Sequence, residues 1–407
     1  MQPHRSVSIW QLTPPAEWPL PPEWLSSSQL TELELCPLKW ALRRASYPDI
    51  WKRRGYPGAF HIGAFNGQVL HLALERIGKF ISSQPDASLV AALRQLGGLS
   101  AILKECIAET TRSNLQENPR IRNVRRLEEH LQAQLPRLRE RLQVLLGSVS
   151  AVTGTMQQDL RSKSGGSSRY PLASGSHVEI DVRSEDLAWI GRIDLLQIDD
   201  KSIEIVDFKS GEIQEHDLGQ LQIYALLWAR DHQLNPGKRL ADNLRLISND
   251  RNVSVAGPTS EQLDLLANEL TTRSESARSS LNVMPPHAQL NSECGNCDVR
   301  HLCESYWSSL KPNPQAQPNS TVRLDAQVAV KSRIGENNWN IEIERSTATY
   351  KAEAVLRNSQ SDASITSALE IGRRFRILNG WLLSPTIADT NAQVLSLGDH
   401  SELFECK

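Results

Sequence analysis

Two stretches of this 407-residue chain place acidic and basic side chains where together they could hold a divalent metal ion. The first stretch ends at Asp194, and the second runs from Val206 to Lys209. Side chains two apart on a strand lie on one face, so we expect Asp207 and Lys209 to point the same way, with Val206 and Phe208 in a core. Carboxylates with water and phosphate oxygens suit Mg²⁺ or Mn²⁺, and a neighbouring lysine can orient or deprotonate an attacking water. The alternative is an ion pair on an exposed strand.

The elements that must position these side chains can be read from the periodicity of apolar residues. Residues 187–194 and 203–208 alternate between apolar and polar and are separated by the turn Asp199–Ser202, which predicts a hairpin. The Cys36-Pro37 pair predicts a break within a helical stretch at 26–46. Further elements are expected as follows: helices at 63–80, 214–231 and 259–282, a mostly helical insertion at 86–160 broken at Pro119 and Pro136, and short strands at 244–248 and 252–256.

Composition gives no global argument for a nucleic-acid partner, because the formal net charge is −2. Any basic surface must therefore be local, and the arginines between 120 and 141 form such a stretch, although a solvated helix with ion pairs explains them equally well. Residues 1–25 form a segment rich in Pro and Trp with no apolar core of the signal-peptide type. No stretch reaches membrane-spanning length, so we expect a soluble, cytoplasmic protein without membrane contacts.

A proline-containing linker at 311–320 precedes a region of different character at 321–407. Five β runs with a helix near 363–370, between the third and fourth runs, are in the order of an OB-fold. Arg373, Arg374 and Arg376 could bind single-stranded nucleic acid there, and the last two alternate with apolar residues and so should face solvent. A structural or protein-docking role for this domain is an equal alternative.

Four short motifs carry a resemblance to a known family: Gly67-x₃-His71, Gly191-Arg192-Ile193-Asp194, Asp207-Phe208-Lys209-x-Gly211 and Gln220-x₃-Tyr224. Over most of 26–310 the chain resembles the RecB-like branch of the PD-(D/E)XK nuclease superfamily. The resemblance implies an α/β restriction-endonuclease-like core with a helical insertion. It also implies that the metal is bound by His71, Asp194, Asp207 and the backbone carbonyl of Phe208, with Lys209 as the catalytic lysine. Gln220 and Tyr224 share one helix face, from which both can reach a phosphate or a base.

Cysteine spacing provides a second feature, since Cys294, Cys297 and Cys303 are clustered but supply only three thiolates. Nucleases of the AddB type and their CRISPR-adaptation and replication relatives place one cysteine before a proline far upstream, and Cys36 fits that layout. The resemblance thus implies a [4Fe-4S] cluster that joins the first helix to the end of the domain as a staple. Zn²⁺ is the alternative, because four thiolates suit it equally. Cys106 and Cys406 are expected to be ordinary thiols.

Together these features predict a metal-dependent DNA nuclease, an exonuclease or flap-type enzyme that acts on single-stranded ends in repair, recombination or antiviral defence. DNA is the expected partner, together with a helicase or another DNA-processing protein. The rival hypothesis is a nucleic-acid-binding or helicase-docking subunit in which hydrolysis is dispensable. Cleavage of RNA is compatible with the same residues.

Overall fold

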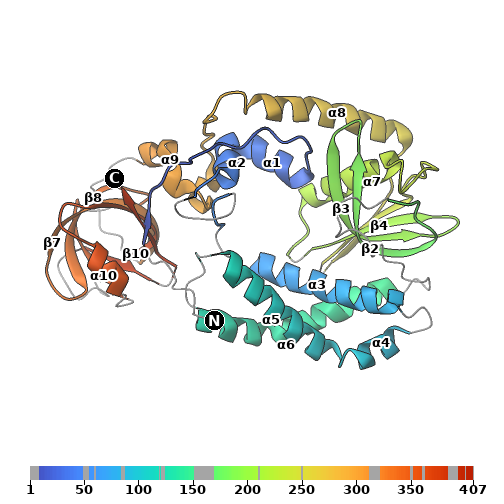
Figure 1. Cartoon of the computed structure of the whole chain (residues 1–407), viewed down its shortest axis with the longest axis horizontal. Helices are drawn as coiled ribbons and strands as arrows, with labels where there is room; N and C mark the ends of the chain where they lie inside the picture. The colour runs from blue at the N-terminus through green and yellow to red at the C-terminus, as the bar shows by residue number, and fades with distance from the viewer. Residues whose placement is uncertain are drawn as a thin grey trace.

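A computed structural model gives the fold (Figure 1). It describes residues 9–48, 55–58, 61–83, 88–118, 120, 124–150, 169–209, 211–248, 251–310, 321–348, 352–359, 363–383, 393–398 and 400–406. The linker expected at 311–320 lies outside these residues. No helix in the described ranges is both long enough and apolar enough to cross a membrane.

A five-stranded sheet forms the centre of the larger unit, in the order β2-β3-β4-β5-β6. Strands β4 and β5 are parallel and every other neighbouring pair is antiparallel. The predicted hairpin is present as β3 and β4, and the Asp199 carboxylate closes its turn by accepting bonds from the amides of Lys201 and Ser202. The strands span Gly175–Ser184 (β2), Trp189–Ile198 (β3), Ile203–Phe208 (β4), Asn243–Ile247 (β5) and Asn252–Ala256 (β6).

Helices cover both faces of this sheet (Figure 1). On one face, helices α7 (Glu215–Arg230), α8 (Ser260–Ser279), α1 (Ser27–Leu35) and α2 (Pro37–Arg44) enclose a core that includes Trp189 and Trp228. On the other face lie α3 (Ile62–Ser83), α4 (Leu89–Gln95), α5 (Leu99–Glu117) and α6 (Val124–Ser150). Cys36 is extended and separates α1 from α2, as Pro37 predicts, whereas α6 continues through Pro136.

Five strands of the smaller unit close into a barrel, because β7 pairs with both β8 and β10. The ring continues from β8 to β9, from β9 to the parallel β11, and from β11 back to β10. The expected helix is α10, between the third and fourth strands. The bounds are Val322–Arg333 (β7), Asn338–Ser346 (β8), Glu353–Asn358 (β9), Ala363–Ala368 (α10), Arg374–Leu383 (β10) and Val394–Leu397 (β11).

Two strands that the sequence pattern did not predict extend the barrel sheet. Strand β12 (Glu402–Cys406) pairs with β10, and β1 (Ile9–Gln11), from the Pro- and Trp-rich segment at 1–25, pairs in parallel with β12. Further along that segment, the Leu25 amide donates to the Ala188 carbonyl of the larger unit at 3.0 Å. The N-terminal segment therefore connects the two units.

A cysteine-containing segment lies between the larger unit and the barrel, and it buries charged side chains there. The segment comprises η1 (Ser292–Asn296), η2 (Arg300–Leu302) and α9 (Glu304–Ser309). The Arg300 guanidinium donates to both carboxylate oxygens of Asp325 on β7, at 2.5 and 3.1 Å. Arg120 pairs with Glu402 of β12 at 2.7 Å. The barrel is thus docked through paired, buried charges.

The expectation that Arg376 faces solvent is wrong. Its side chain is buried under the cysteine-containing segment, where it donates to the His301 carbonyl and to both Glu304 carboxylate oxygens, each at 2.7 Å. Strand alternation correctly places Arg376 outside the barrel core, but another part of the chain covers that outer face. Arg374 remains exposed and pairs with Glu344, and Arg373 pairs with Glu370 and Glu405.

Candidate metal centre and cysteine pocket

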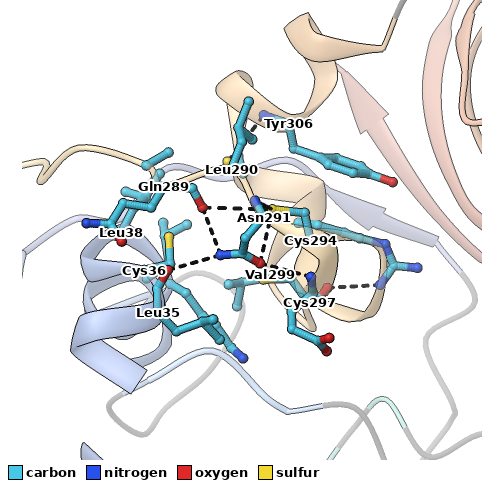
Figure 2. A pocket seen from close by; sticks show the side chains of 16 residues that line it. Leu35, Cys36, Leu38, Gln289, Leu290, Asn291, Cys294, Cys297, Val299 and Tyr306 are labelled. Atoms are coloured by element: carbon cyan, nitrogen blue, oxygen red, sulfur yellow. Dashed lines mark hydrogen bonds between the residues drawn. The ribbon is translucent and has the colours of Figure 1, made fainter. Parts of the chain in front are cut away.

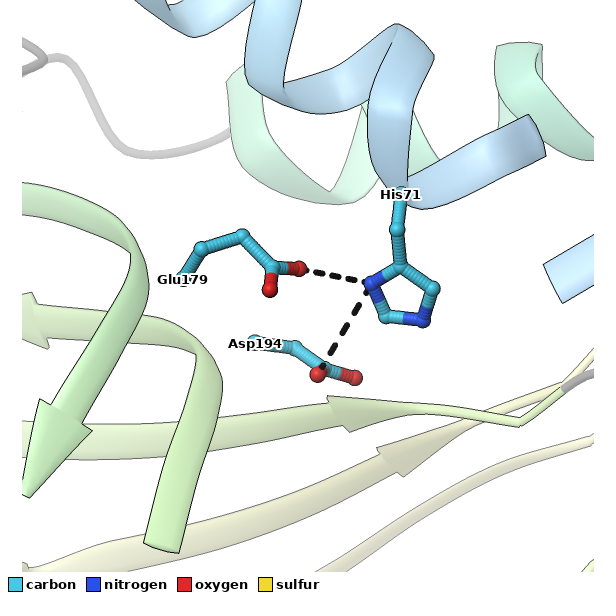
Figure 3. A group of neighbouring side chains, drawn as sticks. All are labelled: His71, Glu179 and Asp194. Atoms are coloured by element: carbon cyan, nitrogen blue, oxygen red, sulfur yellow. Dashed lines mark hydrogen bonds and ion pairs between the residues drawn. The ribbon is translucent and has the colours of Figure 1, made fainter. Parts of the chain in front are cut away.

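Three side chains from separate elements converge between helix α3 and strands β2 and β3 (Figure 3). His71 comes from α3, Glu179 from β2 and Asp194 from β3. The His71 Nδ1 lies 2.6 Å from Glu179 Oε1 and 3.9 Å from Asp194 Oδ1. One possible ligand atom from each residue lies within 4.8 Å of the other two, a spacing that a single ion can bridge. The structure thus brings two predicted ligands, His71 and Asp194, together and adds the carboxylate of Glu179 as a third possible ligand.

Glu179 is the residue that sequence reasoning missed. It lies in the β2–β3 hairpin between the pairs Val178–Leu195 and Ile180–Ile193, which places it opposite Asp194. Its φ of 56° is in the left-handed region, which is uncommon for a residue with a side chain and is often found at functional sites. Hairpin register could have identified it, because the residue across from a proposed ligand is the natural place to look for another.

Asp194 is also connected to strand β4, since its Oδ2 accepts a 2.7 Å bond from the Phe208 backbone amide. Val206 lies in the core between the sheet and the helices α3, α5 and α6, and Phe208 packs against that core. Asp207 and Lys209 alternate with these two residues and so point to the other face, as predicted. Asp207 Oδ2 lies 3.0 Å from Lys209 Nζ. Asp207 therefore lies beside the three converging side chains and makes its direct contact with the lysine.

Lys209 is held by a chain of polar groups from α7. Its Nζ lies 2.9 Å from Asp217 Oδ1 and donates to Gln220 Oε1 at 2.7 Å. The Gln220 amide donates in turn to the Tyr224 hydroxyl at 2.5 Å. The two predicted α7 residues thus lie in the site, and Asp217 is a further acid that the motifs did not indicate.

Burial and mutual repulsion set the protonation of the acids. Burial, and then the negative charge of Asp207, raise the pKa of Asp194 to about 7 despite the opposing charge of His71. Burial also raises the pKa of Asp207, and the Lys209 ammonium opposes that rise. Acids that disfavour each other's charge in a buried site would be stabilised by a cation, so this donor set fits a metal ion.

The pKa values of the two bases, His71 and Lys209, are both raised, as expected beside negatively charged carboxylates. Burial lowers the pKa of His71, but the Glu179 hydrogen bond and the charge of Asp194 outweigh it and raise the value to about 9. Burial likewise lowers the pKa of Lys209, and Asp207 and Asp217 more than offset that effect. Lys209 is accordingly an ammonium at neutral pH, which suits a donor to an anion better than a general base.

All four cysteines of the predicted cluster line one small pocket (Figure 2). Cys36 comes from the junction of α1 and α2, and Cys294, Cys297 and Cys303 come from the segment that precedes the barrel. Backbone amides already point at two of the sulfurs, from Asn291 to Cys294 at 3.3 Å and from Tyr306 to Cys303 at 3.4 Å. Leucines from α1, α2 and the facing loop form much of the remaining wall.

Four thiolates that line one pocket suit either a tetrahedral Zn²⁺ ion or a [4Fe-4S] cluster, so the donor set of this pocket fits both groups. Cys106 lies in the core formed by α3, α5 and α6, and Cys406 lies on β12, so neither cysteine lines the pocket.

No curated protein matches this chain. Among solved structures, it is similar to the crystal structure of SSO0001, with 18% identity over 32% of this chain and 61% of that one and a TM-score of 0.21. It is also similar to a murine DNA binding protein bound with double-stranded DNA, with 10% identity over 56% of this chain and 90% of that one and a TM-score of 0.18. The chain thus spans less than two thirds of the first of these proteins.

A family model gives the assignment that these structures do not. The model described as the PD-(D/E)XK nuclease superfamily matches residues 24–304, well over half of the chain. This range contains the converging acids, the Asp207–Lys209 strand and all four cysteines of the pocket. The chain belongs to the PD-(D/E)XK nuclease superfamily.

Proposed function

We propose that this protein is a metal-dependent DNA nuclease of the RecB-like branch, which degrades or trims single-stranded ends. The observation that carries the proposal is the convergence of His71, Glu179 and Asp194 beside the Asp207–Lys209 pair. A nuclease needs oxygen and nitrogen ligands for a hard ion together with a cation that faces the scissile phosphate. The order of the four sequence motifs and the superfamily match support the same assignment.

In this mechanism His71, Asp194, Asp207 and the Phe208 carbonyl would hold Mg²⁺ or Mn²⁺, with Glu179 as an additional ligand. When bound, the ion supplies Lewis-acid polarisation of the phosphate and lowers the pKa of water. Lys209, kept protonated by its two acid neighbours, donates to the attacking water and offsets the charge that develops on the phosphorane. Gln220 and Tyr224 fix the position of the lysine from α7.

We further propose that Cys36, Cys294, Cys297 and Cys303 hold a [4Fe-4S] cluster. The shared pocket and the backbone amides aimed at sulfur support a group bound by thiolates, and the cysteine layout of the related nucleases favours iron over zinc. Such a cluster would join residues more than 250 positions apart, which removes much of the conformational freedom of the unfolded chain. Its role in this proposal is structural.

For the barrel we propose an OB-fold that serves as a docked structural module. The closed five-strand ring, with α10 between the third and fourth strands, supports the fold assignment. The ion pairs of Arg373 and Arg374, together with those that Arg300 and Arg376 make at the cysteine-containing segment, favour docking over a phosphate track.

The proposed function is tested by incubating the protein with end-labelled single-stranded, duplex and flap DNA in Mn²⁺, with and without a chelator. Cleavage of strands that have free single-stranded ends, abolished by the chelator, is the expected result. DNA binding without any chelator-sensitive cleavage of these substrates would instead favour the rival role as a binding or helicase-docking subunit. A single-stranded RNA of the same sequence tests the choice of nucleic acid.

A further inference from the structure

A cavity next to the candidate metal centre has no role in the mechanism above. It lies between α3, α6 and the carboxyl ends of the parallel strands β4 and β5, and it has a volume of about 150 Å³. In open α/β sheets, ligands bind at the carboxyl ends of parallel strands. The cavity shares His71, Phe208 and Lys209 with the candidate centre, so an occupant would lie against the reacting groups.

The walls of this cavity divide into an apolar part and a cationic part. Leucines and a valine from α3 and α6, namely Leu70, Leu74, Val144 and Leu145, form the apolar wall. Arg141 of α6 provides the charge: its side chain is more than nine-tenths buried, and its guanidinium donates to the Lys209 backbone carbonyl at 3.3 Å. A buried guanidinium that lies beside Lys209 is suited to binding a phosphate.

Gly67, the glycine of the first motif, explains why the cavity is open. It lies one turn before His71 on α3 and lines the cavity, and a Cβ built on it would meet nothing within 4 Å. No close packing and no positive φ therefore accounts for a glycine inside this helix, where glycine costs about 1 kcal/mol relative to alanine. What its missing side chain leaves is space in front of the metal-binding histidine.

We propose that this cavity binds the nucleotide unit adjacent to the scissile bond, with its base against the apolar wall and its non-bridging phosphate oxygens at Arg141. The volume corresponds to about five water molecules, which suits one planar base and not a base pair. The inference rests on the proposed nuclease function and adds to it a reason for acting on unpaired strands, because a base can enter only after it has left a duplex.

The test measures binding of dye-labelled single-stranded DNA in a chelator, so that no strand is cut. Abasic units are placed at each position in turn. For the wild type, an abasic unit at one particular position should weaken binding about tenfold, because the base that enters the cavity is then missing. Gly67→Leu should bind the intact strand about tenfold more weakly and lose that positional sensitivity, because the leucine fills the space that the base occupies.

Gly63→Leu is the matched control, since it lies one turn earlier on α3, is exposed and does not line the cavity. Both variants replace a helical glycine with a strong helix former, so neither should destabilise the fold. A Gly67→Leu protein that binds like the wild type and keeps the same abasic sensitivity overturns the proposal.

A second series examines Arg141 with neutral methylphosphonate linkages at each position. One linkage should weaken wild-type binding about tenfold and have no further effect on Arg141→Gln, because the two changes remove the same contact. Arg139→Gln, an exposed arginine on the same helix, should respond to every linkage as the wild type does. Additive effects of Arg141→Gln with all linkages would overturn the phosphate assignment.

Failure of the wild type to cut any substrate in Mn²⁺ would instead count against the nuclease function and leave this binding result to stand by itself.

Discussion

At the scale of single residues, Asp207 is the side chain whose loss separates chemistry from binding. Asp207→Ala removes a carboxylate from the candidate centre and leaves Lys209 paired with Asp217. Cleavage of end-labelled DNA should fall below detection, while binding of the same DNA in a chelator should be unchanged or tighter, since one repulsive charge is gone. Asp200→Ala in the exposed hairpin turn is the control and should cut normally. Near wild-type cleavage by Asp207→Ala would refute the assignment of the centre.

Glu179 gives a second prediction at this scale. Glu179→Gln keeps a group that can accept a bond from His71 but removes a charge that faces the metal position. The Mn²⁺ concentration needed for half-maximal cleavage should rise by about tenfold, the usual effect of losing such a partner. Calorimetric titration of Mn²⁺ into the protein without DNA measures the same loss independently. An unchanged metal affinity would limit Glu179 to a structural contact with His71.

The site residues differ in how far the sequence could reveal them. Those within motifs, such as His71 and Asp207, could be proposed because their spacing is characteristic. Glu179 could not, since its position depends on hairpin register and on a backbone conformation that no local pattern indicates. Arg376 was misjudged because strand alternation distinguishes the core from the outer face but does not reveal whether another segment covers that face.

At the scale of elements, the close approach of β3 and α7 depends on Gly191. A Cβ at this position would lie 2.9 Å from atoms of both Tyr224 and Leu227, so a larger residue must push α7 away from the sheet. Gly191→Ala should lower the free energy of unfolding by about 1–3 kcal/mol, as overpacking does. Cleavage should also fall, because Gln220 on α7 positions Lys209.

The measurement is denaturant unfolding of Gly191→Ala alongside a glycine on α7 itself. Gly219→Ala is that control: a Cβ there meets nothing within 4 Å, so the alanine should be neutral or stabilising. If both variants unfold at the same denaturant concentration as the wild type, the packing argument for the second motif is wrong.

Element prediction from the sequence worked best where one element forms its own pattern. The hairpin, the break at Cys36 and the helices α7 and α8 all have local signals in turn residues, caps and period. Strands β1 and β12 were not predicted, because each is short and is defined by its pairing with a strand far away in sequence. Non-local pairing is the property that local periodicity does not record.

For the whole molecule, the four pocket cysteines should act as a unit. Protein purified without oxygen should be brown and contain about four irons per chain, as a [4Fe-4S] cluster requires. Cys36→Ser should bleach the colour and loosen both the nuclease unit and the barrel, since the cysteine-containing segment contacts each. Cys106→Ser should keep the iron, because that thiol lies in the helical core, where burial raises its pKa to about 11. Stoichiometric zinc without iron would overturn the cluster.

Docking of the barrel should depend on pH through His301. This imidazole is fully buried and stacks on Phe404, and burial together with Arg120, Arg300 and Arg376 lowers its pKa well below 6.5. In the unfolded chain it takes up a proton near pH 6.5, whereas in the folded chain it stays neutral. The contribution of His301 to stability is thus present above that pH and is lost as the pH falls below it, by up to about 1.4 kcal/mol per pH unit.

The measurement compares the free energy of unfolding of the wild type and His301→Phe between pH 5 and 8. Phe cannot be protonated and can still stack on Phe404, so the difference between the two proteins should shift in favour of the variant at acid pH. Parallel curves across this range would show that His301 does not couple protonation to docking.

The pairing of β1 with β12 also has a mechanical consequence. The two strands are parallel, and nearly 400 residues of chain separate them. A force that pulls on the N-terminal side of β1 and the C-terminal side of β12 would slide the strands past each other and load all of their hydrogen bonds at once, instead of opening them one at a time. The force would thus be borne first by this short strand pair. The candidate metal centre and the cysteine pocket, which lie between β1 and β12 in the sequence, would be shielded until the pair ruptures. Single-molecule pulling from the two ends would detect this as one initial rupture before any extension of the nuclease unit.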